Sequence, residues 1–79
     1  MAAAIFKSTV NYGSQTIELR DNTDTDRVEE AIVAALESGG GWVSLPLAAG
    51  SRVILVTAGV PIDIRSWTYT PSDRQAVIL

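Results

Sequence analysis

Residues 23–41 read TDTDRVEEAIVAALESGGG, and this stretch decides the fold class because it holds the chain's helical pattern. At about 100° per residue, its apolar side chains fall in one stripe. The stripe consists of Val28, Ala31, Ile32, Ala35 and Leu36. Thr23 or Asp24 can cap the N-terminus, and the glycines from residue 39 can end the helix. The pattern predicts one amphipathic helix from about residue 25 to residue 38.

The segments on both sides of this helix have the composition and alternation of strands. The predicted strands cover residues 4–10, 15–20, 42–48, 52–57 and 60–69. In the second of them, Ile17 and Leu19 share one face and polar side chains share the other, which indicates a sheet with one solvated side. The expected order is β-β-α-β-β-β, an α+β fold with a single helix packed on one face of a mostly antiparallel sheet.

Two of these strands have unusual features. Pro46 cannot donate to a ladder, so the strand at 42–48 is predicted to lie at an edge or to carry a bulge. The strand at 52–57 is apolar on both faces through residues 53–56. Such a strand is central, covered on two sides, or part of an interface.

The length of 79 residues predicts one domain, which we place at residues 1–74. Residues 75–79 form an apolar C-terminal tail that includes Val77, Ile78 and Leu79. This tail can pair as a final strand of the same domain. It can equally add to the sheet edge of a neighbouring subunit.

The composition argues against several kinds of chemistry. The chain has no Cys and no His, which excludes disulfides, thiolate zinc sites and Ser-His-Asp catalysis within one chain. Its nine carboxylates lie mostly at the helix start or on the polar face of the helix, so we expect no enzymatic activity and no cofactor. The net charge of −3 argues against binding to nucleic-acid phosphates.

The N-terminal residues do not match a signal peptide, and no apolar run approaches the roughly 18 residues of a membrane span. We therefore expect no membrane partner and a soluble chain, in the cytoplasm or, if phage-encoded, in a virion.

Asn22, Asp24 and Asp26 have the spacing of the first ligands in a calcium loop. Such a loop needs Gly at its sixth position and Glu at its twelfth, where this chain has Arg27 and Val33. A helix N-cap explains these residues better, and no metal site is expected.

The last predicted strand carries an aromatic stripe. Strict alternation places Ile62 and Ile64 on one face, and Asp63, Arg65, Trp67 and Tyr69 on the other. Either the stripe is exposed, or a bulge near Ser66 turns the aromatic side chains inward. Exposed Trp, Tyr and Arg are typical of binding hot spots. The candidate interaction residues are Arg65, Trp67, Tyr69, Val77, Ile78 and Leu79.

Residues 15–65 show a particular order of elements. A strand comes first, followed by a Thr/Asp-rich helix start and the helical segment VEEAIVAAL at 28–36. A Gly-Gly step, two strands and a closing Ile-x-Ile segment come after it. This arrangement resembles a small actinobacterial family of uncharacterised α+β proteins. The triple Gly, the aromatic residues 67 and 69 and the apolar tail depart from that family. The resemblance implies a fold and no activity. Small accessory proteins of actinobacterial phages are similar in length and in sequence character.

The function expected from these features is that of a non-enzymatic structural or interaction module. It would self-associate as a homo-oligomer or dock on a larger protein assembly. The reason is that a chain this short, without disulfides or metals, cannot bury all of its apolar residues in its own core. Two alternatives remain open at this point: a phage virion accessory protein of the capsid or tail, and a small regulatory ligand-binding domain that uses the face around Trp67.

Overall fold

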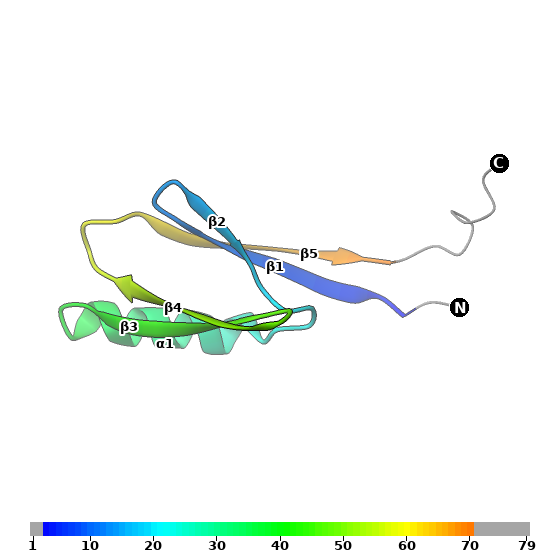
Figure 1. The fold of residues 1–79 in the computed structure, drawn as a ribbon, viewed down its shortest axis with the longest axis horizontal. Helices are drawn as coiled ribbons and strands as arrows, with labels where there is room; N and C mark the ends of the chain where they lie inside the picture. The colour runs from blue at the N-terminus through cyan, green and yellow to red at the C-terminus, as the bar shows by residue number, and fades with distance from the viewer. Residues whose placement is uncertain (1–2, 71–79) are drawn as a thin grey trace.

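The structure is a computed structural model that describes residues 3–70, which form one helix and five strands (Figure 1). In chain order they are β1 (Ile5–Tyr12), β2 (Gln15–Glu18), α1 (Thr25–Glu37), β3 (Gly41–Leu47), β4 (Gly50–Val56) and β5 (Ile62–Tyr69). The α+β class and the order β-β-α-β-β-β are confirmed. The predicted interaction residues Val77, Ile78 and Leu79, with the rest of the tail, lie outside the described residues.

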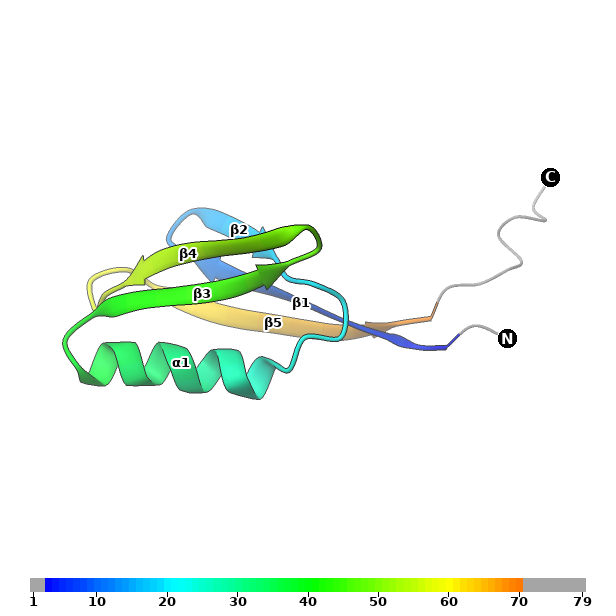
Figure 2. The ribbon, with the colours of Figure 1, turned by 60° about the horizontal axis from the view of Figure 1, so that its bottom comes forward.

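The strands form two antiparallel sheets. Sheet A has the order β2-β1-β5, and sheet B is the hairpin of β3 and β4 (Figure 2). In sheet A, β1 pairs along its whole length with β5, from Ile5 opposite Tyr69 to Tyr12 opposite Ile62. The strand β2 pairs only with the second half of β1, from Thr9 to Tyr12.

Helix α1 is capped at both ends by local chemistry. The Asp24 side chain accepts a hydrogen bond from the backbone N–H of Asp26, which satisfies one free donor of the first turn. Ser38 is the C-cap, and the N–H of Gly40 donates to the carbonyl of Ala35 over 2.7 Å. Gly40 has φ of 121°, a conformation that side chains with a Cβ rarely adopt. The sequence prediction for this helix is correct to within one residue.

Strand ends differ from the prediction where backbone hydrogen bonds lead elsewhere. Just past the end of β2 at Glu18, the Leu19 N–H still donates to Ser8 in β1, but the next N–H, that of Arg20, donates to Pro46 in β3. This divergence joins the two sheets. Pro46 itself lies in β3, whose ladder is with β4, in agreement with its expected edge position.

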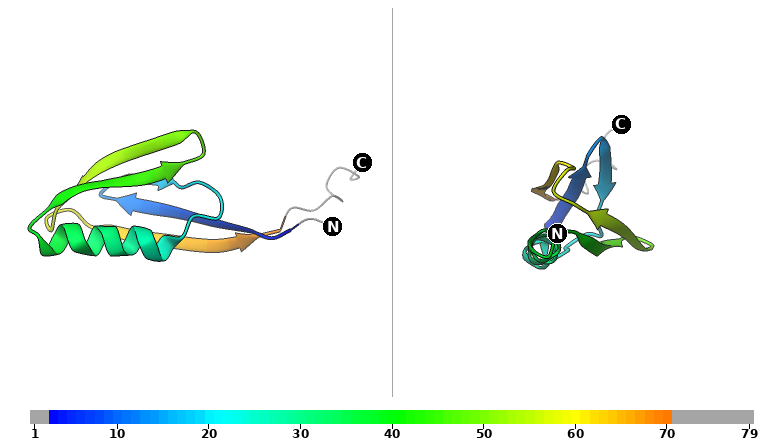
Figure 3. Two further views of the ribbon diagram at one scale, coloured as in Figure 1. Left: turned by 90° about the horizontal axis from the view of Figure 1, so that it is seen from below. Right: turned by 90° about the vertical axis from the view of Figure 1, so that its left-hand side faces the viewer.

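The core lies between sheet A, the hairpin and α1. Figure 3 shows the three parts around one interior, with the helix alongside β3 and the two sheets facing one another. The buried apolar side chains are Val10, Ile17, Leu19, Val28, Ile32, Ala35, Val43, Leu45, Ile54 and Val56. Of the predicted helix stripe, Val28, Ile32 and Ala35 are buried, Leu36 is half-buried and Ala31 is exposed.

Two further side chains connect the sheets. The Tyr12 hydroxyl of β1 donates to the backbone carbonyl of Leu55 in β4. The Arg52 guanidinium donates to the side-chain amide oxygen of Gln15 in β2. The hairpin is thereby fixed with one face against sheet A and the other face turned outward.

Candidate interaction surfaces

The outward face of the β3–β4 hairpin carries three of the six exposed large hydrophobic residues in the described part of the chain. Side chains alternate along each strand, so three pairs of opposite residues share this face. They are Trp42 with Leu55, Ser44 with Val53, and Pro46 with Ser51. None of the six is charged. We call these residues the hairpin face.

Three members of the hairpin face are large apolar residues in contact with solvent. Trp42 is 70% exposed, Val53 is 53% exposed and Leu55 is 44% exposed. On the opposite side of the same strands, Leu45 and Val56 are completely buried. The strand β4 is therefore neither central nor covered on both sides by the described residues.

A shallow hollow of about 360 Å³ lies beside one end of the hairpin face. Ser44 and Pro46 line it from β3, while Arg27, Val28 and Ala31 line it from the first half of α1. The segment 20–24 completes its wall. Its lining includes apolar residues, Val28, Ala31 and Pro46, and charged ones, such as Arg27, a combination that suits an aromatic side chain with one polar edge.

The second surface is the outward face of sheet A, which carries the predicted aromatic stripe. The β1–β5 register is continuous past Ser66, so Arg65, Trp67 and Tyr69 stay on one outward face. Trp67 is 42% exposed and Tyr69 is 41% exposed. The Arg65 guanidinium carbon lies 5.9 Å from the centroid of the Trp67 ring, within the range of a cation–π contact. Of the two arrangements open from the sequence, the structure has the exposed one.

Polar side chains surround this stripe. The Asn11 amide donates to the Asp63 carboxylate over 2.6 Å, and its oxygen accepts from the Thr16 hydroxyl at 3.0 Å. Lys7, opposite Trp67 in the ladder, donates to Asp21 over 2.9 Å. The hydrogen bond to Asp21 raises the pKa of Lys7 above its ordinary value, because it favours the charged ammonium group.

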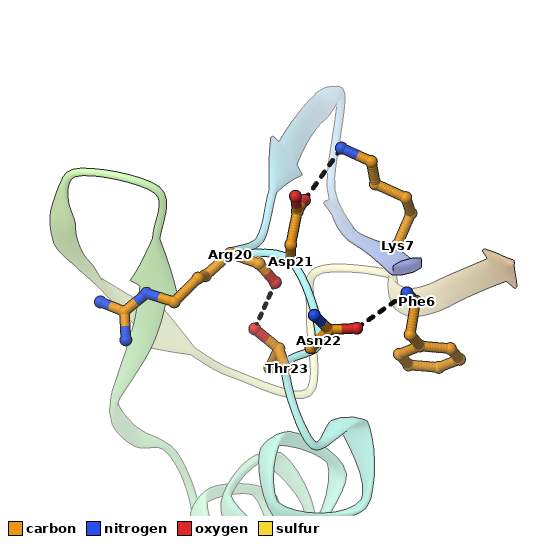
Figure 4. A network of polar contacts seen from close by, with 6 residues as sticks. All are labelled: Phe6, Lys7, Arg20, Asp21, Asn22 and Thr23. Carbon is orange, nitrogen blue, oxygen red and sulfur yellow. Dashed lines mark hydrogen bonds and ion pairs between the residues drawn. The ribbon is translucent and has the colours of Figure 1, made fainter. Parts of the chain in front are cut away.

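The Lys7–Asp21 pair belongs to a polar network that fixes the segment before α1 (Figure 4). Asn22 adopts a left-handed conformation with φ of 60°, and its side-chain oxygen accepts from the N–H of Phe6 at 2.9 Å. The Asn22 N–H returns a bond to the Phe6 carbonyl. Thr23 donates to the carbonyl of Arg20 over 2.6 Å. These bonds fix the backbone that leads into α1, which agrees with the expectation that this segment forms the start of the helix.

A third surface feature is a groove of about 370 Å³ between α1 and β5. Its lining includes the apolar side chains of Ile32, Leu36, Ile62 and Ile64 and the acidic side chains of Glu29 and Asp63. Val33, which is 45% exposed, forms part of its wall. Both charged residues of this groove are acidic.

The hairpin face was not among the residues predicted from the sequence. The available signal was the apolar run at 53–56, which already indicated a strand with two apolar faces. Trp42 carried no such signal, because it shares a strand face with the polar Ser44, and a face with one apolar and one polar residue can point inward or outward. The predicted residues Arg65, Trp67 and Tyr69 lie together, on a different sheet from the hairpin face.

Within residues 3–70, no group of three acidic side chains gathers closely enough to hold a metal ion. The helix in this part of the chain has 13 residues and is too short and too polar to cross a membrane. Comparison with protein-family models, with curated proteins and with solved structures gives no match.

Proposed function

We propose that this chain is a non-enzymatic structural or interaction module that self-associates or docks on a larger protein assembly. The observation that carries the proposal is the hairpin face, where Trp42, Val53 and Leu55 are in contact with solvent. A monomeric protein gains nothing from an uncharged face with an exposed Trp at its end, whereas an interface uses Trp as an anchor.

The free energy of burying apolar surface favours contact between this face and a partner. Trp42 exposes 70% of its surface, which for a large aromatic of up to about 250 Å² is about 175 Å². At about 25 cal/mol per Å², its burial contributes about 4 kcal/mol before the entropy of association is subtracted. That entropic cost is about 4 kcal/mol or more, so Val53, Leu55 and their surroundings must contribute as well.

Sedimentation velocity tests the self-association arm. We expect the average mass to rise between about 1 µM and about 1 mM, and the rise to disappear in Trp42→Ser. A chain that remains monomeric throughout this range refutes self-association. Size-exclusion chromatography of an extract of the source cells tests docking. Elution of the native chain at the volume of a monomer refutes it.

The outward face of sheet A favours a second candidate, a small regulatory ligand-binding domain. Its supporting observation is the stacking of Arg65 on Trp67, which presents a cation and an aromatic edge together. The emission of Trp67, measured in a Trp42→Phe variant, tests this candidate. A blue-shifted spectrum that acrylamide does not quench in the monomer would show that no binding stripe is open.

The alternative is an accessory protein of a phage capsid or tail. It also predicts a β-rich module that associates with other proteins, but places it in a virion instead of the cytoplasm. The position of the gene separates the two. A gene outside any cluster of phage structural genes removes the virion alternative.

A further inference from the structure

We propose that the hairpin face is covered by a second copy of this chain, related by a two-fold axis, with Trp42 of each copy seated in the hollow beside Pro46 of the other. This inference rests on the proposed self-association and names its surface and geometry. Three properties of the described residues lead to it: the charge of the face, its shape, and the position of the hollow.

Charge is the first property. The whole chain carries a net charge of −3, so most contacts between two copies bring like charges together. The six residues of the hairpin face carry no charge, and two copies can approach there without repulsion between them. The face also offers no charge pattern that would favour a different, charged partner.

Shape is the second property. The face narrows along the strands, from the large pair Trp42–Leu55, through Ser44–Val53, to the small pair Pro46–Ser51. A two-fold axis that lies in the interface and crosses the strands at the middle pair reverses this order in the second copy. Each large pair then lies over a small pair, which is the arrangement that fills space between packed layers.

The hollow is the third property. Under this symmetry, the Trp42 ring of one copy lies over Pro46 of the other, and the hollow of about 360 Å³ opens beside Pro46. Ala31 is one of the lining residues and has only a methyl side chain, so it occupies little of this space. Arg27 lies in the wall, where its guanidinium can face the indole ring. One chain therefore provides both the Trp42 side chain and the hollow that receives it in the proposed dimer.

The size of the contact predicts a weak dimer. The two strands of the hairpin have seven residues each, so the hairpin is about 24 Å long and about 10 Å wide. With its helical flank it covers less than the roughly 800 Å² per partner of a standard interface. We expect a dissociation constant in the range of about 1 µM to about 100 µM. The exchange between monomer and dimer then falls within reach of ordinary dilution.

The other two surfaces suit a second copy less well. The outward face of sheet A includes Lys7, Asp63 and Arg65, each of which already has a contact within the chain. The α1–β5 groove has Glu29 and Asp63 in its lining, and a two-fold contact there would bring acidic side chains together.

The two tryptophans allow a direct test, because one lies on each outward face. Trp67→Phe leaves Trp42 as the reporter, and Trp42→Phe leaves Trp67. On raising the concentration from about 1 µM to about 1 mM, we expect Trp42 emission to shift to the blue and its acrylamide quenching to fall at least about two-fold. The emission of Trp67 should stay constant over the same range.

A matched pair of helix variants tests the hollow itself. Ala31 and Val33 are both exposed on α1, but only Ala31 lines the hollow, whereas Val33 lines the α1–β5 groove. We expect Ala31→Arg to weaken the dimer at least about ten-fold and Val33→Arg to change it less than about two-fold. Circular dichroism of both variants confirms that each is folded before the dimer is measured.

The possible results separate this inference from the proposed function. If the wild-type chain does not self-associate at any concentration, the hairpin-face dimer and the self-association arm of the proposed function fail together, while the docking arm is decided by its own test. If it associates but Trp67 reports the contact, or Val33→Arg breaks the dimer and Ala31→Arg does not, self-association stands and the hairpin-face dimer is overturned. A Trp42 shift that Ala31→Arg abolishes supports the full geometry.

Discussion

The Tyr12 hydroxyl donates a hydrogen bond to the backbone carbonyl of Leu55, and this bond ties sheet A to the hairpin. The two residues are 43 positions apart in the chain. Because the bond holds the Leu55 backbone, it helps to decide that the Leu55 side chain points outward. The orientation of the hairpin face thus depends on a tyrosine in the other sheet.

Tyr12→Phe should lower the free energy of unfolding by about 1 kcal/mol, because it removes the hydrogen bond between sheet A and the hairpin. Urea denaturation measures the change. An unchanged midpoint would mean that solvent replaces this bond at no cost. Tyr69→Phe is the matched control, since that side chain is 41% exposed and outside the core.

Leu45 and Leu55 form a natural pair of probes, since they lie on opposite faces of the same hairpin. Leu45 is completely buried, and Leu45→Ala should cost about 2–5 kcal/mol of stability. Leu55→Ala should cost much less in the monomer but weaken self-association, because its side chain is 44% exposed. Thermal unfolding and sedimentation together measure both effects. Equal losses of stability would contradict the assignment of the two faces.

Gly40→Ala should destabilise the chain by about 1–3 kcal/mol. Gly40 has φ of 121°, and an added Cβ would approach the Val56 carbonyl oxygen to 3.3 Å. Gly59→Ala is the control: Gly59 has no positive φ, and a Cβ there meets no atom within 4 Å. Chemical denaturation of the two variants should show a loss for Gly40→Ala alone.

Ser8→Ala should leave stability unchanged or raise it by up to about 1 kcal/mol. The Ser8 side chain is 1% exposed, and its hydroxyl finds no hydrogen-bond partner among residues 3–70. Alanine removes the hydroxyl and keeps the rest of the side chain. A clear loss of stability in urea denaturation would instead indicate that the hydroxyl is bonded, for example to a trapped water.

The Lys7–Asp21 pair should produce a pH dependence at the alkaline end. The pKa of Lys7 is raised in the folded chain, so its contribution to stability is complete below the unfolded value of 10.5 and is lost as the pH rises through the folded pKa. Comparing wild type with Lys7→Met from neutral pH to pH 11 isolates this effect. The difference between them should shrink only above about pH 10. A difference that vanishes near neutral pH would contradict the pairing.

Much of this architecture was accessible from the sequence. Asp24, the apolar stripe from Val28 and the glycines after Ser38 determine α1, because capping and periodicity act within a few residues of each other. The alternation in β5 correctly placed Arg65, Trp67 and Tyr69 on one face. It could not show whether the strand stayed regular past Ser66.

Only the tertiary structure decided how the strands are divided and which side of the hairpin faces the core. Ladder contacts such as Asn11 with Asp63 join residues 52 positions apart, and no local pattern specifies them. In β4, apolar residues occupy both faces, so the sequence alone gives no preference between Val53 and Leu55 on one side and Ile54 and Val56 on the other. The choice is made by packing, since Ile54 and Val56 lie among the buried side chains of the core. That choice leaves Val53 and Leu55 beside Trp42 on the outside.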